Sequence, residues 1–183
     1  ADPAPVNAVK AGKQAANSLP VYVAAGRETA WEMFRFGPQY PKPFAGMQFP
    51  LDSQAEFWKQ MVPDWSYSLP MPNPTVTALA ELPGKSGPTV LVSHSQSGIY
   101  PFQAAALNPG GVSAIVAIEP SACPAKNADM SVFRKVPSLV VFGDNVDTSP
   151  FWSARLKSCR EFVEAATAAG ATAELRLLPD LGF

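Results

Sequence analysis

The chain has 183 residues, of which 47% are hydrophobic and 16% are charged. This is the length of one domain, and it is long enough to bury a core without metal or disulfide support. The 14 basic and 15 acidic residues give a formal net charge of −1, which excludes a protein that neutralises a row of nucleic-acid phosphates. No apolar run approaches the ~18 residues of a membrane span. We therefore expect a soluble, compact domain with no nucleic-acid partner and no membrane span.

Proline is abundant, with 20 residues in all, and it divides the first half of the chain into short helices. Apolar residues at helical spacing predict a helix within 18–36, followed by an irregular, proline- and aromatic-rich loop over 37–50. An S-x-x-E capping box that starts at Ser53 predicts a short helix to Met61. An Asn-Pro pair predicts the start of another helix over 73–82.

After residue 84 the pattern changes to apolar strands that alternate with helices. Strands are predicted at 89–93, 112–118, 138–142 and 172–178, and helical segments at 97–107, 129–135 and 151–169. Continuous apolar strands joined by helices indicate an α/β fold with a mostly parallel sheet covered on both faces. We therefore divide the chain into a helical cap or substrate-pocket segment, residues 1–84, and an α/β core segment, residues 85–183.

The most informative segment is Ser-His-Ser-Gln-Ser-Gly at 93–98, which joins the first strand directly to a helix. It is a variant of the G-x-S-x-G nucleophile elbow, with serine in place of both outer glycines. Such a turn exposes Ser95 at the carboxyl edge of the sheet and aims the backbone N–H of Gln96 at a developing oxyanion. The alternative is that Ser95 only caps the helix, but the strand before it and the helix after it favour a nucleophile.

A serine nucleophile needs a base, and the base needs a carboxylate that orients it. Two strand ends after the elbow offer one: Glu119 follows the second strand, and Asp144 and Asp147 follow the third. A turn beside Gly and Asn explains Asp144 without catalysis, whereas a glutamate that ends a very apolar strand has little local reason to be there. The residues favour Glu119 slightly, with Asp144 and Asp147 as alternative acids.

The base is harder to find, because His94 is the only histidine in the chain. On an extended, sharply turned backbone its side chain and that of Ser95 should point apart. We interpret His94 as a packed residue of the elbow and not as the base.

The two cysteines, Cys123 and Cys159, lie 36 positions apart and have no CxxC or CxxH spacing. This excludes a zinc site or a thioredoxin-type motif. The count alone allows either one disulfide or two buried thiols.

Several longer motifs occur together in this chain. They are Phe-Gly-Pro-Gln-Tyr-Pro at 36–41, Gln-Met-Val-Pro-Asp-Trp at 60–65, Asn-Pro-Thr-Val at 73–76, His-Ser-Gln-Ser-Gly-Ile-Tyr-Pro-Phe-Gln at 94–103, Glu-Pro at 119–120 and Val-Phe-Gly-Asp at 141–144. Together they resemble a small group of bacterial serine esterases with the α/β-hydrolase fold, over nearly the whole chain. The resemblance implies a carboxylic-ester hydrolase with Ser95 as nucleophile, Glu119 as the acid and a small-molecule ester as substrate.

Members of this group are exported, which implies a secreted or periplasmic protein and favours a Cys123–Cys159 disulfide. They also continue past both ends of the present chain. Further strands and a second oxyanion donor precede it, and the loop that carries the catalytic histidine follows it. We therefore expect an internal segment of the hydrolase domain, with the missing segments of that domain as its partner. No metal or organic cofactor is implied.

The leading hypothesis is ester hydrolysis by a Ser–Glu–His acyl-enzyme mechanism whose histidine lies outside this chain. The alternative is a non-catalytic binding module that has kept the elbow and lost its base. An acyltransferase would use the same residues for the first half-reaction.

Overall fold

The computed structural model describes residues 4–15, 25–61 and 74–179. The helices are α1 (Ala4–Lys10), α2 (Arg27–Met33), α3 (Gln54–Gln60), α4 (Pro74–Glu81), α5 (Pro83–Ser86), α6 (Tyr100–Leu107) and α7 (Pro150–Ala168). Short 3-10 helices are η2 (Leu51–Ser53), η3 (Ser95–Ile99), η4 (Met130–Arg134) and η5 (Val146–Thr148). The strands are β1 (Thr89–His94), β2 (Val112–Ile118), β3 (Ser138–Phe142) and β4 (Ala173–Leu177). In the part of the chain described, no helix is long and apolar enough to cross a membrane.

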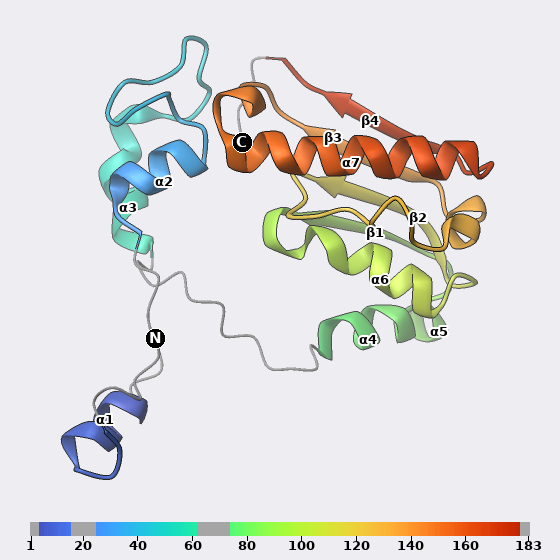
Figure 1. Cartoon of the computed structure of the whole chain (residues 1–183), viewed down its shortest axis with the longest axis horizontal. Coiled ribbons are helices and arrows are strands. Elements are labelled where there is room, and N and C mark those ends of the chain that lie inside the picture. The colour runs from blue at the N-terminus through green and yellow to red at the C-terminus, as the bar shows by residue number, and fades with distance from the viewer. Residues whose placement is uncertain (1–3, 16–24, 62–73, 180–183) are drawn as a thin grey trace.

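The four strands form one parallel sheet in the order β1-β2-β3-β4 (Figure 1). Each strand is rich in β-branched or long apolar residues, which favour extended backbone, and each begins and ends within one residue of its predicted position. The predicted α/β class is confirmed. All four strands run toward the same edge, so the residues that follow β1, β2 and β3 meet there.

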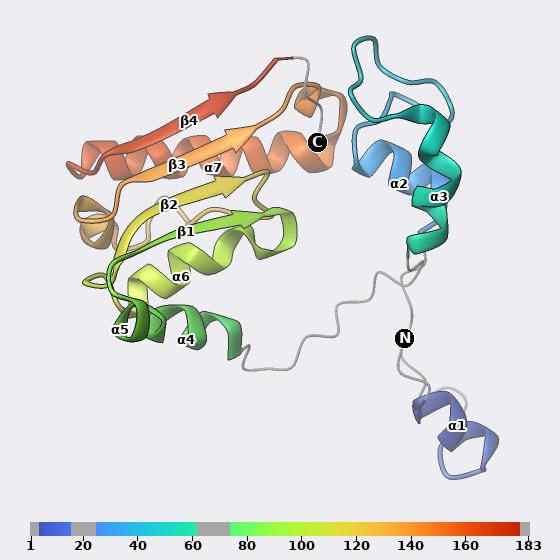
Figure 2. The same ribbon diagram turned by 180° about the vertical axis from the view of Figure 1, so that it is seen from behind.

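Helices α6 and α7 cover one face of the sheet. They lie in front of it in Figure 1 and behind it in Figure 2. Inward-facing strand residues pack against the aromatic rings of this helical layer, and the largest of these buried side chains are Ile115, Val140, Phe142, Phe102 and Phe162. The rings of Phe102, Phe133 and Phe162 meet edge to face, with centroids 5.1–6.0 Å apart. This layer is the hydrophobic core of the chain.

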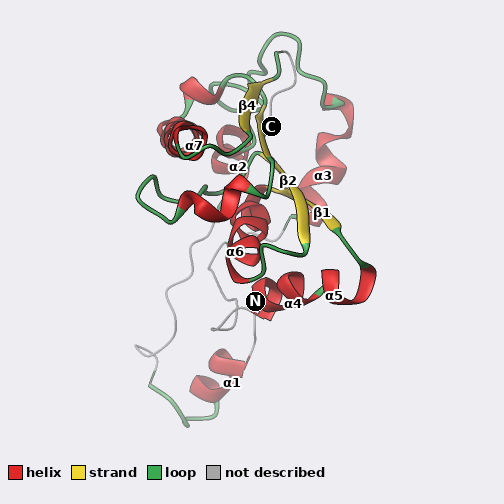
Figure 3. Cartoon of the chain, turned by 90° about the vertical axis from the view of Figure 1, so that its right-hand side faces the viewer, coloured by secondary structure: helices red, strands yellow, loops and turns green. Residues whose placement is uncertain are grey.

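The opposite face of the sheet is not covered by the described residues, so the prediction of two covered faces is wrong for this part of the chain (Figure 3). On this face, strand pairing places apolar residues of β1, β2 and β3 side by side. We call these residues the bare sheet face: Val90, Val92, Ala114, Val116, Ile118, Leu139 and Val141. Val90 and Val92 are 53% and 65% exposed. β1 also forms an edge of the sheet, with strand pairing only to β2 among the described residues.

The first half of the chain contributes two separate groups of helices. α4 and α5 pack beside α6, where Asn108 Nδ2 donates to the carbonyl of Ala80 at 2.8 Å. α2 and α3 lie near the carboxyl edge of the sheet in both Figure 1 and Figure 2. There the indole N–H of Trp152 in α7 donates to the carbonyl of Met33 at 2.6 Å. The division of the chain at residue 84 stays a prediction.

The helix predictions for the first half are only partly correct. Within 18–36, α2 occupies Arg27–Met33, and residues 18–24 lie outside the described residues. Ser53 precedes α3 as expected but makes no side-chain capping hydrogen bond. α4 begins at Pro74, and its predicted cap, Asn73, lies outside the described residues.

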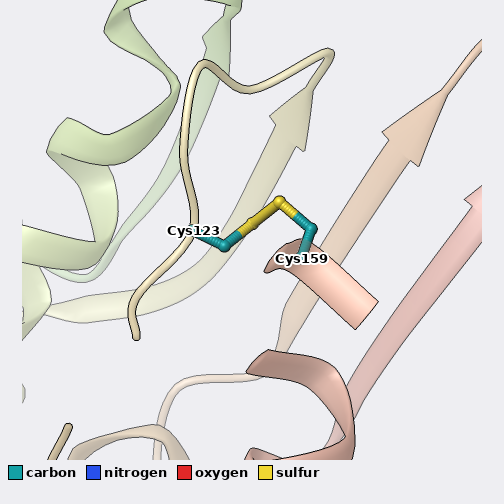
Figure 4. The surroundings of a disulfide bond; sticks show 2 residues. All are labelled: Cys123 and Cys159. Carbon is teal, nitrogen blue, oxygen red and sulfur yellow. A yellow bond between two sulfur atoms is a disulfide. The ribbon is translucent and has the colours of Figure 1, made fainter. Parts of the chain in front are cut away.

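A disulfide joins Cys123, in the loop after β2, to Cys159 in α7 (Figure 4). Both residues are buried, and the disulfide implied by the family resemblance is present. The two cysteines are 36 positions apart in the sequence. The disulfide therefore links the loop between β2 and β3 covalently to α7, which covers the sheet.

We expect replacement of both cysteines by serine to lower the free energy of unfolding by about 4 kcal/mol, because opening a loop of this length increases the conformational entropy of the unfolded chain by a corresponding amount. Urea unfolding followed by tryptophan fluorescence measures the difference. The control is the wild-type chain treated with a reductant, which should lose the same stability, while the double variant should not respond to the reductant. Equal stability of the oxidised wild type and the double variant would contradict the prediction.

Candidate active site

Ser95 lies at the junction of β1 and η3 in a backbone conformation that serine rarely adopts. Its φ is 54°, whereas the preceding His94 is fully extended, with φ of −136° and ψ of 142°. Left-handed backbone at a residue other than glycine costs free energy and is concentrated at functional sites. A nucleophile elbow requires this sharp strand-to-helix turn, and Ser95 is half-buried, at the surface of the carboxyl edge.

The loop after β2 fixes the elbow from one side. The backbone N–H of Ser121 donates to the Ser95 carbonyl at 2.8 Å, and the Ser121 hydroxyl donates to the Gln96 carbonyl at 3.1 Å. Gly98 is buried against Pro120, and a Cβ on Gly98 would overlap the Pro120 Cα. Position 98, the last of the Ser-His-Ser-Gln-Ser-Gly segment, therefore has to be glycine, because the backbone after Glu119 passes so close to it.

Gln96 is in the first turn of η3, where backbone N–H groups lack partners within the helix. Its side chain is exposed. This placement is compatible with the predicted oxyanion donor, which stays a prediction.

Glu119 is the buried carboxylate at the end of β2. Only 2% of the residue is exposed, and its φ of 47° turns the chain sharply away from the strand. Its Oε1 accepts the backbone N–H of Gly143 at 2.5 Å, from the end of the neighbouring strand β3. Ser121, which binds the elbow, follows Glu119 by only two residues, so Glu119 and Ser95 lie at the same edge of the sheet.

Arg35 supplies the positive charge that this buried carboxylate needs. Its Nη2 contacts Glu119 Oε1, and its Nη1 donates to Oε2 at 3.1 Å. Its Nε donates to the backbone carbonyl of Asp144 at 2.9 Å, and its guanidinium lies over the ring of Trp152, 4.9 Å from the centroid. Arg35 is not among the predicted site residues, although a single cation inside the aromatic segment Trp31–Phe36 is a weak signal for a buried charge.

The two alternative acids lie at the same edge in different surroundings. Asp144 is half-buried, and its Oδ1 accepts the side-chain amide of Asn145 at 2.9 Å. Asp147 is exposed in η5. Of the three carboxylates, Glu119 is the one held by the Arg35 fork.

His94 does not occupy the place that we expected. It continues the exposed side of β1, where its partner in the strand register is Ile118, and it is exposed. The interpretation as a packed elbow residue is therefore wrong, because strand alternation turns its side chain to the bare sheet face. Within the described residues, no group of three His, Cys, Asp or Glu side chains is arranged to hold a metal ion.

The aromatic residues of the first half form their own cluster around Phe36. Its ring stacks on Phe49 at 4.7 Å and meets Phe57 edge to face at 5.6 Å. An open cavity of about 670 Å³ adjoins this cluster. The residues that line it are Ala25, Gly26, Arg27, Tyr40, Gln54, Ala55, Trp58, Lys59 and Met61. None of the predicted catalytic residues is among them.

The chain is similar in sequence and structure to a protein of known fold. No protein-family model and no curated protein matches the chain. A solved structure described as a novel bacterial esterase aligns with a TM-score of 0.86 and 50% sequence identity. A bacterial esterase shares this fold. The alignment covers 100% of this chain and 58% of the esterase, so the chain spans less than two thirds of the length of that protein.

We expect Gly98→Ala to destabilise the chain by about 1–3 kcal/mol, the usual cost of forcing a methyl group into a packed site. The matched control is Gly84→Ala in α5, where an added Cβ meets nothing within 4 Å. That variant should be as stable as the wild type or more stable by about 0.4–1 kcal/mol. Thermal unfolding of both variants provides the comparison, and a harmless Gly98→Ala would contradict the close contact with Pro120.

Proposed function

We propose that this chain is the nucleophile-bearing part of a carboxylic-ester hydrolase of the α/β-hydrolase fold. The observation that carries the proposal is the left-handed backbone of Ser95 between a strand and a helix, bound to the loop that follows the buried Glu119. The similarity to a bacterial esterase at 50% identity supports the same reaction. The substrate class is a small-molecule ester.

In the proposed reaction, Ser95 Oγ attacks the ester carbonyl carbon and transfers its proton to a histidine. The carbonyl electrons move to oxygen, and the backbone N–H of Gln96 stabilises the resulting oxyanion. The oxyanion collapses, and the alcohol leaves with the proton from the histidine. Water then attacks the acyl-serine by the same route and releases the carboxylic acid. Glu119 orients the imidazole and stabilises its charged form.

The histidine of this mechanism has to come from polypeptide outside the chain. His94 is the only histidine in the chain, and it is exposed on β1 in register with Ile118 of the bare sheet face. The bare sheet face supports the same conclusion, because parallel sheets are almost always covered on both faces. We infer that further segments of the same hydrolase domain pair with β1, cover this face and supply the base.

Export of the protein is part of the proposal. The Cys123–Cys159 disulfide supports it, because structural disulfides persist in oxidising compartments and are rare in the cytosol. A secreted or periplasmic location follows.

We expect a fluorophosphonate probe to label the native protein that contains this chain once, on Ser95. Ser95→Ala should lose labelling and at least about 10³-fold of the activity on 4-nitrophenyl acetate, because no other group supplies the nucleophile. Ser113→Ala is the control, since Ser113 is exposed at the opposite end of β2 from Glu119. Peptide mass mapping identifies the labelled residue.

Ester hydrolysis that survives Ser95→Ala would contradict the proposal. A native protein with neither activity nor labelling would favour the alternative, a non-catalytic binding module.

The covering of the bare sheet face can be tested by thiol labelling, because both native cysteines of this chain are in the disulfide. Val92→Cys in the native protein should resist maleimide. The matched control is Leu107→Cys at the end of α6, since Leu107 is 63% exposed and Val92 is 65% exposed. In the native protein we expect the cysteine at 92 to react at least about tenfold more slowly. Equal rates, measured by peptide mass mapping, would show that nothing covers the face.

A further inference from the structure

We propose that Arg35 is a positioning residue for the catalytic acid: it fixes the carboxylate of Glu119 so that one acceptor site is left for the base. This inference rests on the proposed function. It goes beyond the proposed function because it assigns a role to Arg35, a residue of the first half of the chain. No motif of the hydrolase core includes Arg35.

The hydrogen bonds of Glu119 leave little freedom to its carboxylate. A carboxylate has about four acceptor positions, two on each oxygen. Oε1 accepts from Arg35 Nη2 and from the backbone N–H of Gly143, and Oε2 accepts from Arg35 Nη1. Among the hydrogen bonds of the described residues, one position therefore remains, on Oε2, and we infer that an imidazole N–H would use it.

The backbone of Arg35 indicates that its side chain is needed at this position. The N–H of Phe36 bonds to the Trp31 carbonyl at 2.9 Å, and the N–H of Arg35 bonds to the Glu32 carbonyl at 3.1 Å. These two bonds form a Schellman motif at the end of α2, in which Arg35 occupies the left-handed position that glycine usually fills. Its φ is 50°. An arginine is strained there, whereas a glycine would not be.

The Arg35 guanidinium is itself held by contacts other than its ion pair with Glu119. The Arg35 side chain is 0% exposed. Its Nε is bound to the Asp144 carbonyl after β3, and its planar group lies over Trp152 of α7. Trp152 in turn donates to the carbonyl of Met33, two residues before Arg35. The loop after β3 and helix α7 therefore fix the guanidinium independently of its ion pair with Glu119.

The shape of the arginine side chain matters in addition to its charge. A guanidinium presents paired N–H groups in one plane and binds both carboxylate oxygens, whereas a lysine ammonium is a point charge and cannot set the orientation of the carboxylate plane. Arg35→Lys should therefore keep the charge balance of the buried pair and still lose the orientation of Glu119.

Arg35→Gly in the native protein tests the proposal, because glycine is the better backbone residue at this position. We expect kcat on 4-nitrophenyl acetate to fall by about 10- to 100-fold, the range for losing an outer partner of a functional group, with KM changed less than about twofold. Added guanidinium ion at millimolar concentration should restore part of kcat by entering the space left by the side chain. Arg35→Lys should lose kcat in the same way.

A double-variant cycle separates positioning from general structural support. If Arg35 acts through Glu119, then Arg35→Gly combined with Glu119→Gln should be no slower than Glu119→Gln alone, within about threefold. The combination also removes both charges of the pair, so it remains informative where Arg35→Gly alone fails to fold. Additive losses of kcat would overturn the proposal.

The matched control is Arg134→Ala. The Nε of Arg134 also donates to a backbone carbonyl, that of Ala169 at 2.6 Å, but Arg134 is exposed and is not paired with Glu119. Its replacement should leave kcat within about twofold. Wild-type activity in Arg35→Gly, with Ser95 still labelled, would overturn the role of Arg35 and leave the proposed function standing. A wild-type protein without activity or labelling would overturn both.

Discussion

The buried ion pair between Arg35 and Glu119 joins the two halves of the chain at the carboxyl edge of the sheet. A carboxylate at this depth needs a partner, because an ionised group removed from water without one is very unfavourable. Arg35 meets that need from a segment 84 positions earlier, and its own Nε and ring contacts fix the ends of β3 and α7 around it. The ion pair thus contributes both to the position of α2 beside the sheet and to the orientation of Glu119, together with the Trp152 and Gly143 hydrogen bonds.

The residues to which we assign roles in the proposed chemistry have strained backbone conformations. Ser95, Glu119 and Arg35 all have positive φ values, although none of them is glycine. Ser121 binds the elbow and Gly143 binds the Glu119 carboxylate, each from a neighbouring element, whereas Arg35 is held by the Schellman motif at the end of its own helix α2. Strained residues persist when the surrounding packing determines their conformation. The core formed by α6, α7 and the sheet provides that rigid support.

The sequence predicted well what depends on local pattern. The sequence places each strand within one residue, because short runs of β-branched or long apolar residues between turns determine the strands locally. Glu119 is favoured because an acidic residue directly after such an apolar run is unusual. The bare sheet face was not predicted, since an apolar residue such as Val92 indicates burial without saying what covers it. Arg35 could not be found, because its role depends on contacts with Glu119 and Trp152 that lie far away in sequence. Ser53 carries a capping motif whose hydrogen bond does not form.

The disulfide lies close in sequence to the residues around the Arg35–Glu119 ion pair. Cys123 follows Glu119 by four positions, and Cys159 follows Trp152 by seven, or about two turns of α7. The covalent bond thus connects the loop after Glu119 with the helix whose indole lies against Arg35. Assembly of this edge of the sheet is consequently linked to thiol oxidation. A host cell that keeps thiols reduced would produce a chain in which this loop lacks its covalent link to α7, whereas passage through an oxidising compartment would form the link.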